Sequence, residues 1–293
     1  MTPDRRREKD EEGGESALFV VSTPIGNLSD VSRRARQVLG RVDLVLAEDT
    51  RRTRILMDHL DLSTPLRSLH AHNEASRIDE VLEMLGAGRS LALVSDSGTP
   101  LVSDPGERLV AAVTEAGWRV VPVPGPSALL AALVGSGFST ERFSFLGFPP
   151  RKGEERARIL DEVAGSTRTT VLFESPERLV RLLEDLEGLC GPDRRVVVAR
   201  ELTKVHEEFR RGTIPEVSGY YEEHPPLGEI VVVVEGSPGR EEPDEVDAEA
   251  AELLARALLD QGMRPSRASR EVARRLGIPR NLAYDLVHSL DDA

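Results

Sequence analysis

Residues 91–106 read LALVSDSGTPLVSDPG, which places small, acidic and glycine residues directly after an apolar run. The run Leu91–Val94 predicts a buried strand, and an apolar helical pattern begins at Leu109. The segment between them would lie at the carboxyl end of a strand, where open α/β sheets bind their ligands. Glycine lets a ligand approach the backbone, and aspartate accepts hydrogen bonds from hydroxyls or an amine. The residues of these types are Gly98, Gly106, Asp96 and Asp104.

Two further segments favour a binding site over a plain loop with helix caps, although Ser and Asp are common caps. Leu18–Val21 and Arg119–Val123 also predict strands, and they lead into the small-residue loops Ser22–Asp30 and Pro124–Ala128. Repeated units of strand, small-residue loop and helix suggest one shared crevice. No GxGxxG follows the first strand and no GxxxxGKS or GxxxxGKT occurs, so a Rossmann or P-loop nucleotide site has no support.

Charged residues follow two other predicted strands and could handle an acceptor group. Glu48, Asp49 and Arg51 follow the strand at 43–47, and Lys204 lies in the charged run after the strand at 196–199. A cation such as Lys204 would lower the pKa of a bound hydroxyl or hold a phosphate. The same residues are also explained by acids in the first turn of a helix and by a solvated charged loop. The sequence shows no metal-ligand spacing, so no metal site is predicted.

Composition restricts the class of protein. A chain of 293 residues can form two core-bearing domains. A membrane-spanning helix needs about 20 apolar residues, and no apolar run in the sequence approaches that length. The charged N-terminus lacks the apolar segment of a signal peptide. The single cysteine, Cys190, excludes an internal disulfide framework. We therefore expect a cytoplasmic protein with no membrane partner.

The charge distribution keeps an RNA partner open despite a net charge of −13. Residues 236–252 hold seven acids and one Arg, whereas residues 261–281 hold six Arg and one Glu. An acidic segment and a basic one are therefore adjacent. Phosphate binding depends on where Lys and Arg gather more than on their sum. A second basic patch begins at Arg151 and Lys152, in a Pro-stiffened segment that could dock an RNA backbone.

The expected fold class is α/β, with a small helical module at the C-terminus. Strands at 18–22, 43–47, 66–69, 91–95 and 119–123 alternate with helical patterns, which implies a mostly parallel sheet. Further strands are expected at 144–147, 169–174, 196–200 and 229–235, and residues 266–276 and 281–290 resemble a helix-turn-helix. The expected parts are a disordered tail (1–16), two α/β domains (17–124 and 125–235), an acidic linker (236–247) and a helical RNA-contacting module (248–293).

Eight motifs in order resemble the tetrapyrrole-methylase superfamily of S-adenosylmethionine (SAM) enzymes, and within it the small-subunit rRNA methyltransferase I family. They are TPIGNLSD (23–30), AEDTRRT (47–53), HNE (72–74), SDSGTPLVSDPG (95–106), PGPSA (124–128), GFPPRK (147–152), FESPERL (173–179) and ARELTKVHEE (199–208). Each motif alone is weakly diagnostic, but their order and spacing are specific. The resemblance runs from about Ala17 to the end of the chain.

The resemblance implies a two-domain fold with a cofactor cleft between the domains, SAM as cofactor, and a homodimer. It also implies methyl transfer to the ribose 2′-hydroxyl of a cytidine in the decoding region of 16S rRNA. The cofactor residues that it suggests are Pro24, Gly26, Asp96, Gly98, Val102, Ser103, Ser127 and Ala128. The suggested catalytic residues are Glu48, Asp49, Arg51 and Lys204, with the general base left open. The expected RNA contacts are Arg151, Lys152, Arg267, Arg270 and Arg274.

Two other classes of function remain open at this stage. One is a SAM-dependent methylase of a tetrapyrrole or corrin intermediate, which would not need the AEDTRRT, HNE and RELTK segments or the basic tail. The other is a DNA-binding regulator that uses the terminal module, which would leave the α/β cleft without a role. If the protein methylates rRNA, its two separated basic patches can bind at the same time only to a surface of fixed shape. The assembled small subunit is therefore the expected substrate.

Overall fold

The computed structural model describes residues 16–70, 73–237, 248–260, 263, 265–276 and 280–291. The chain divides into two compact units, Met1–Glu235 and Gly236–Ala293. Residues 1–15 of the expected charged tail (1–16) and residues 238–247 of the expected acidic linker (236–247) lie outside the described residues.

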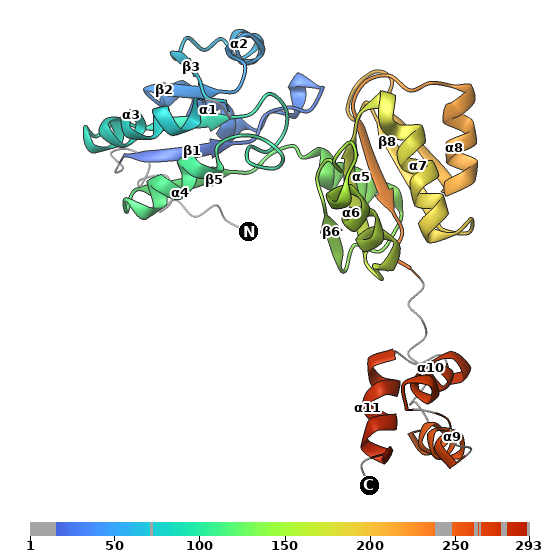
Figure 1. Cartoon of the computed structure of the whole chain (residues 1–293). Coiled ribbons are helices and arrows are strands. Elements are labelled where there is room, and N and C mark those ends of the chain that lie inside the picture. The colour runs from blue at the N-terminus through green and yellow to red at the C-terminus, as the bar shows by residue number, and fades with distance from the viewer. Residues whose placement is uncertain are drawn as a thin grey trace, which may run out of the picture. The chain divides into compact units, whose positions relative to one another are not determined.

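The first α/β half of the larger unit is a parallel sheet covered by helices (Figure 1). Its strands are β1 (Ala17–Val21), β2 (Leu44–Ala47), β3 (Leu66–Ser68), β4 (Leu91–Val94) and β5 (Arg119–Val123). They lie in the order β3-β2-β4-β1-β5, and every neighbouring pair is parallel. The helices are α1 (Arg33–Arg41), α2 (Thr50–His59), α3 (Glu74–Gly86) and α4 (Glu107–Glu115), with a short 3-10 turn η1 (Leu28–Asp30).

The apolar runs of the central strands are explained by burial on both faces of this sheet. In β2, Leu44 and Leu46 pack with residues of α3 and α4, whereas Val45 and Ala47 pack with residues of α1 and α2. Alternate side chains of a strand point to opposite faces, so a strand covered on both sides is apolar throughout. Because the strands of this sheet are parallel, they all end on the same side. The loops after β1, β4 and β5 therefore lie at one edge of the sheet.

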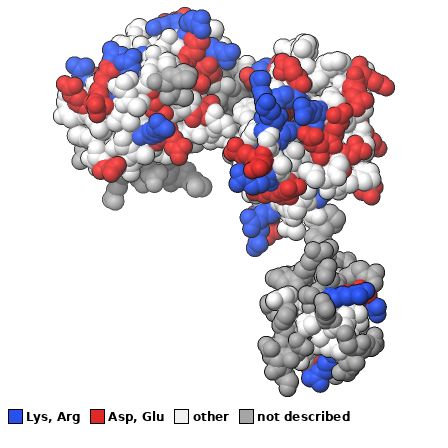
Figure 2. All heavy atoms as spheres, viewed as in Figure 1, with Lys and Arg blue, Asp and Glu red and all other residues white. Residues whose placement is uncertain are grey.

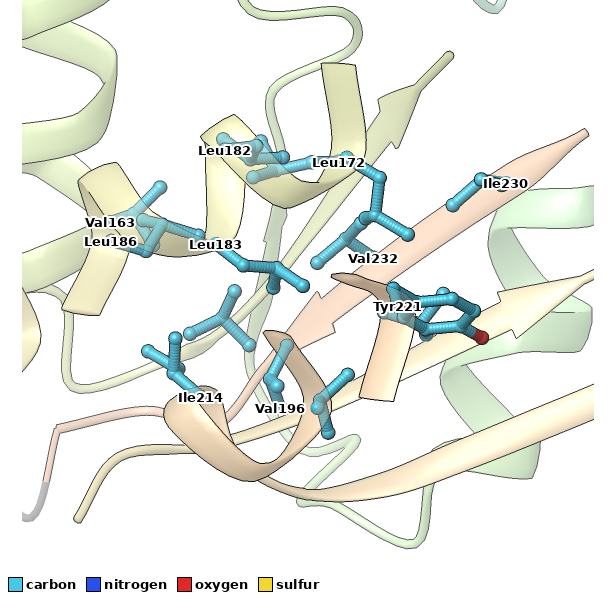
Figure 3. Packing of buried hydrophobic residues seen from close by; sticks show 14 of the residues in the cluster. Val163, Leu172, Leu182, Leu183, Leu186, Val196, Ile214, Tyr221, Ile230 and Val232 are labelled. Carbon is cyan, nitrogen blue, oxygen red and sulfur yellow. The ribbon is translucent and has the colours of Figure 1, made fainter. Parts of the chain in front are cut away.

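The second α/β half contains a mixed sheet in the order β6-β7-β10-β8-β9. Its strands are β6 (Phe143–Phe145), β7 (Thr169–Glu174), β8 (Arg195–Arg200), β9 (Glu208–Thr213) and β10 (Ile230–Val234), and its helices are α5 (Ala128–Ser136), α6 (Glu154–Gly165), α7 (Pro176–Cys190) and α8 (Ile214–Glu223). The strand β10 runs antiparallel to both β7 and β8. Leucines and valines of α6 and α7 pack on one face of this sheet, together with Tyr221 of α8 (Figure 3).

The strand β9 lies where the sequence offered only a charged run. It pairs with β8 at the edge of the sheet, and Arg200 meets Glu208 across the pair at 3.1 Å. The guanidinium of Arg210 lies 3.5 Å from the centroid of the Tyr220 ring. Charged side chains are tolerated on an edge strand because solvent and neighbouring rings satisfy them. A periodicity search for apolar residues therefore misses this strand.

The C-terminal unit is a three-helix bundle with a core of its own. It consists of α9 (Ala248–Asp260), α10 (Pro265–Leu276) and α11 (Arg280–Asp291). Small and branched residues, among them Ala255, Ala268, Val272 and Val287, form its buried centre. The two expected helices of the helix-turn-helix are present, although the residues between them, 277–279, lie outside the described part of the chain. Within the described residues, no helix has both the length and the apolar content to cross a bilayer.

Candidate functional site

The three small-residue loops of the first half are joined by hydrogen bonds. Thr23 and Gly98 exchange backbone hydrogen bonds with N···O distances of 2.8 and 3.2 Å. The hydroxyls of Ser22 and Thr99 lie 3.1 Å apart, and Thr99 Oγ1 donates to the carbonyl oxygen of Pro126 at 3.1 Å. Residues from the loops after β1, β4 and β5 therefore form one continuous wall.

This wall borders a cleft of about 430 Å³ that the second half closes from the other side. The first half and the start of α5 contribute residues 48, 52, 96–99, 102–104 and 127–128, which we call the first wall of the cleft. The second half contributes residues 148, 173–176 and 228–231. A cleft of this size is in the usual range for a cofactor or drug-sized ligand.

Most of the residues suggested for cofactor binding line this cleft, namely Asp96, Gly98, Val102, Ser103, Ser127 and Ala128. Pro24 and Gly26 are not among the lining residues. Gly26 instead packs against the Lys204 side chain so closely that a Cβ atom at this position would lie only 2.5 Å from Lys204 Cγ. Its neighbour Ile25 belongs to the apolar cluster of the second sheet. The loop after β1 thus anchors the first half to the second beside the cleft.

The loop after β4 has a strained backbone. Gly98 has a φ of +83°, which glycine adopts without cost, but Leu101 and Ser103 also have positive φ values, of 72° and 67°. Such conformations cost about 1–3 kcal/mol each for other residues and cluster at functional sites. The strain supports a loop shaped for a ligand rather than a passive connection.

Three carboxylates give the first wall a negative charge. The pKa of Asp104 is raised to about 6, mainly by burial; a hydrogen bond from Ser95 lowers it, and the charges of Glu48 and Asp96 contribute to the rise. Burial also raises the pKa of Glu48, with a contribution from the Asp96 carboxylate. Asp96 accepts a hydrogen bond from the Asp49 amide at 2.9 Å and lies 3.6 Å from Arg52. This wall can bind a cationic ligand and can accept a proton near neutral pH.

Asp49 and Arg51 lie beside the cleft rather than in it. Asp49 caps α2 through a 2.9 Å hydrogen bond from the Arg51 amide, and the Arg51 guanidinium binds its other oxygen at 2.7 Å. The side-chain hydrogen bond from Arg51 lowers the pKa of Asp49 to about 2, so this carboxylate stays charged. The Arg51 side chain is 89% exposed. The arginine of this motif that lines the cleft is Arg52, which the sequence analysis did not single out.

Lys204 lies at the rim of the cleft, in the loop between β8 and β9. Its Nζ donates to Glu201 at 2.8 Å and to Glu229, a lining residue, at 3.3 Å. Burial alone would lower the pKa of Lys204, but the hydrogen bonds and charges of these two carboxylates have the larger combined effect, so the pKa of Lys204 is raised. Thr203 Oγ1 accepts a hydrogen bond from the Asn27 amide at 3.0 Å, which ties this loop to the first half. Lys204 is therefore a permanent cation, unsuited to act as a base.

The second wall contains residues that the sequence analysis missed. The rings of Phe148 and Phe173 pack with centroids 5.3 Å apart. Glu174 is buried, and its Oε1 accepts hydrogen bonds from the Ser175 amide at 2.8 Å and from Arg178 Nε at 3.0 Å. Its Oε2 is buried without a partner among the described residues. An unpaired buried acceptor is costly, so this oxygen suits a ligand hydroxyl or amine. An acid at the end of the apolar strand TTVLFE was the available signal.

The residues suggested for RNA contact occupy exposed positions where the structure describes them. Arg151 and Lys152 are exposed in the segment between β6 and α6, and Arg267 is exposed on α10. The side chains of Arg270 and Arg274 lie outside the described part of the structure. Across the described residues, no three His, Cys, Asp or Glu side chains gather in a way that could hold a metal ion.

Comparison with known proteins identifies the fold family of this chain. A family model described as Tetrapyrrole (Corrin/Porphyrin) Methylases matches residues 17–218, and one described as RsmI C-terminal HTH domain matches residues 244–291. The methyltransferase CobJ has a TM-score of 0.59 at 21% identity, covering 76% of this chain and 95% of its own. A Thermus thermophilus uroporphyrin-III C-methyl transferase complexed with S-adenyl homocysteine has a TM-score of 0.53 at 18% identity, covering 74% and 96%. The fold is that of a tetrapyrrole methylase, which confirms the expected fold class.

Relatives of higher identity narrow this class. A Synechocystis protein named ribosomal RNA small subunit methyltransferase I is 44% identical over 94% of this chain and 98% of its own length. Proteins of the same name from Thermotoga maritima and Escherichia coli O157:H7 are 48% and 40% identical, over 75% and 93% of this chain and 98% and 95% of their own. The chain belongs to the small-subunit rRNA methyltransferase I family of the tetrapyrrole methylases. The resemblance carried by the eight motifs is confirmed.

Proposed function

We propose that this protein transfers a methyl group from SAM to the ribose 2′-hydroxyl of a cytidine in the decoding region of 16S rRNA. The observation that carries the proposal is family membership over nearly the whole chain, including the C-terminal module. Corrin and porphyrin methylases share the fold at no more than 21% identity among the structures compared above. A tetrapyrrole substrate is therefore the weaker alternative.

The cleft suits SAM by charge and by shape. SAM carries a sulfonium and an ammonium group, and the wall of Glu48, Asp96 and Asp104 supplies the opposite charge. Gly98 leaves room for the ligand to approach the backbone of its loop. When bound, SAM supplies the activated methyl group, and the protein holds the donor and the acceptor oxygen in line. The residues proposed for this task are the six lining residues named above, with Pro24 and Gly26 supporting their loop.

The acceptor hydroxyl is a poor acid, so methyl transfer needs a group that takes its proton. We assign this role to Asp104, since its pKa of about 6 leaves it ionised at neutral pH yet more basic than an ordinary aspartate. Glu48 lines the same part of the cleft, and its charge contributes to the raised pKa that burial mainly causes. Asp49 and Arg51 fix the start of α2, and Lys204 places a positive charge at the rim, where the RNA would enter.

The proposal is tested by mapping ribose methylation in a strain that lacks the gene. Primer extension at low nucleotide concentration should lose one stop in the decoding region, and expression of the intact protein should restore it. A calorimetric titration with S-adenosylhomocysteine should show binding to the purified protein. Binding without any change in rRNA methylation would favour the tetrapyrrole alternative, whereas absence of binding would reject both methylase functions.

Alanine variants of Glu48, Arg51 and Lys204 are expected to lose most methylation while they bind S-adenosylhomocysteine normally. Arg51 and Lys204 are not among the residues that line the cleft, and Glu48 lies in the loop after β2 rather than in the small-residue loops. The charge of Glu48 is expected to act on the sulfonium of SAM, which S-adenosylhomocysteine lacks. Single-turnover methylation of small subunits and calorimetry separate the two effects. Full activity in all three variants would show that the acceptor approaches from another side.

The preferred substrate is expected to be the assembled small subunit. The C-terminal unit has its own core, so removal of residues 248–293 leaves both sheets of the larger unit intact. We expect this truncation to weaken binding to subunits and to flatten its salt dependence, because phosphate contacts are lost. Affinity for S-adenosylhomocysteine should stay the same. Equal methylation of protein-free rRNA and purified subunits by the intact protein would contradict this choice of substrate.

We further propose a homodimer that acts in the cytoplasm, where its ribosomal substrate is found. Leu130 and Val134 on α5 are 50% and 70% exposed, which leaves an apolar face that a second copy could cover. Light scattering at micromolar concentration should report twice the chain mass. A monomer under these conditions would contradict the proposal.

A further inference from the structure

A second cavity, of about 330 Å³, adjoins the cleft at the start of α7. It is lined by four arginines, Arg151, Arg156, Arg178 and Arg181, together with Ser175 and Glu177. Ser175 lines both this cavity and the cleft. Figure 2 shows Lys and Arg side chains gathered on the surface over this part of the second half. We call this cavity the arginine pocket.

Two of the arginines hold the pocket together. Arg156 is buried, binds Asp185 at 2.6 Å and donates to the carbonyl oxygen of Pro150 at 3.1 Å. Arg178 binds Glu174 at 3.0 Å and also donates to the carbonyl oxygen of Pro149. These bonds fix the loop that carries Arg151 against the first turn of α7.

The other two arginines are available to a ligand. Arg151 and Arg181 are exposed, and neither has a carboxylate partner among the described residues. Glu177 is the one acid that lines the pocket, so positive charge prevails in it. A guanidinium group presents a planar fork of donors that matches two oxygens of a phosphate. The amide groups at the start of α7 add to the attraction for an anion, and the Ser175 hydroxyl makes no capping bond there.

We propose that the arginine pocket binds the phosphodiester next to the methylated nucleotide. The inference rests on the proposed function, since it requires that the cleft methylates RNA. A ribose and its adjoining phosphate are neighbours along one strand, and the cleft and the pocket are neighbours along one wall at Ser175. The pocket would thereby set which ribose of the strand enters the cleft.

The first test removes the two available arginines together. The variant with Arg151→Ala and Arg181→Ala should raise KM for unmethylated small subunits about tenfold or more, with kcat within about twofold of wild type. The slope of log KM against log salt should fall by about 2, one for each lost contact. Affinity for S-adenosylhomocysteine should not change. Should the alanine pair fail to fold, a milder pair, Arg151→Gln with Arg181→Gln, removes both charges but keeps polar side chains that retain the Cβ, Cγ and Cδ atoms.

Arg168→Ala is the matched control. Arg168 is likewise exposed in the same half, but it lies at the amino end of β7, whereas the pocket adjoins the carboxyl end of this strand at Ser175. The control should keep the wild-type KM and salt slope. If the double variant behaves like Arg168→Ala while the wild type methylates subunits, the pocket does not bind the substrate. If the wild type methylates no subunits at all, the proposed function fails instead.

The second test locates the phosphate. Subunits are reconstituted with rRNA that carries one uncharged methylphosphonate next to the target cytidine, introduced by ligation. The wild type should lose affinity for these subunits by about the same factor as the double variant loses for normal ones. The double variant should show no further loss, since the contact is already absent. Independent losses that multiply would place this phosphate outside the arginine pocket.

Discussion

Replacing Gly98 with leucine is expected to abolish binding of S-adenosylhomocysteine to the folded protein. Gly98 lines the cleft, and its backbone exchanges hydrogen bonds with Thr23. A Cβ atom at this position would already lie 3.2 Å from Ile25 Cγ2, so a leucine side chain must displace this neighbour or the loop of Gly98 that lines the cleft. The backbone φ of +83° adds strain for any residue with a side chain. Calorimetry should show no heat of binding, while the circular dichroism spectrum stays that of the wild type.

Gly88→Leu provides the control for backbone strain. Gly88 has nearly the same φ, +80°, but a Cβ atom there meets nothing within 4 Å. Both variants therefore force leucine into the left-handed region, and only the one at position 98 crowds a loop that lines the cleft. The Gly88 variant should bind S-adenosylhomocysteine with wild-type affinity. Unchanged affinity in a folded Gly98→Leu protein would mean that the cofactor binds elsewhere.

The first wall of the site could be predicted from the sequence because its signals are local. Strands β1, β4 and β5 are short runs rich in apolar residues, and each is followed at once by a loop of small residues. Parallel strands bring such loops to one edge, so reading each strand and its loop is enough. That arrangement explains the backbone hydrogen bonds between Thr23 and Gly98 and the contact between the hydroxyls of Ser22 and Thr99.

The second wall could not be predicted in the same way because it depends on strand pairing far apart in the sequence. β10 lies antiparallel to β7, and this pairing sets Ile230 opposite Glu174. Only then do Gly228 and Glu229 reach the same cleft as Phe173 and Ser175. Neither apolar periodicity nor residue type indicates the register of two antiparallel strands separated by this much chain.

The orientation of α2 about its axis explains why the sequence analysis chose Arg51 and not Arg52. Arg51 and Arg52 are adjacent in the motif AEDTRRT, and residue type cannot tell which of them faces the cleft. Asp49 caps α2 and binds Arg51 on the outside, so the next residue along the turn is directed toward Asp96. The cap that fixes this phase was visible in the sequence only as an acid at the start of a helix.

Asp104→Asn is expected to lower the rate of methyl transfer by about 10²–10⁴, the usual contribution of a general base. The asparagine keeps the size of the side chain but cannot take a proton from the ribose hydroxyl. Binding of S-adenosylhomocysteine should change far less than the rate. Thermal stability should not fall, because burial raises the pKa of Asp104 and its ionised form is thus disfavoured in the folded state.

The pH profile of the wild type provides the sharper test of the same assignment. A base must be ionised, so kcat/KM should rise with pH through an apparent pKa of about 6 and level off above about 7. The negative charge of Glu48 contributes to the raised pKa of Asp104, so Glu48→Gln should shift this limb to lower pH without removing it. Asp104→Asn should remove the limb and leave the residual rate flat between about pH 5 and 8. If Glu48→Gln removes the limb and Asp104→Asn retains it, Glu48 is the proton acceptor and Asp104 only sets its charge environment.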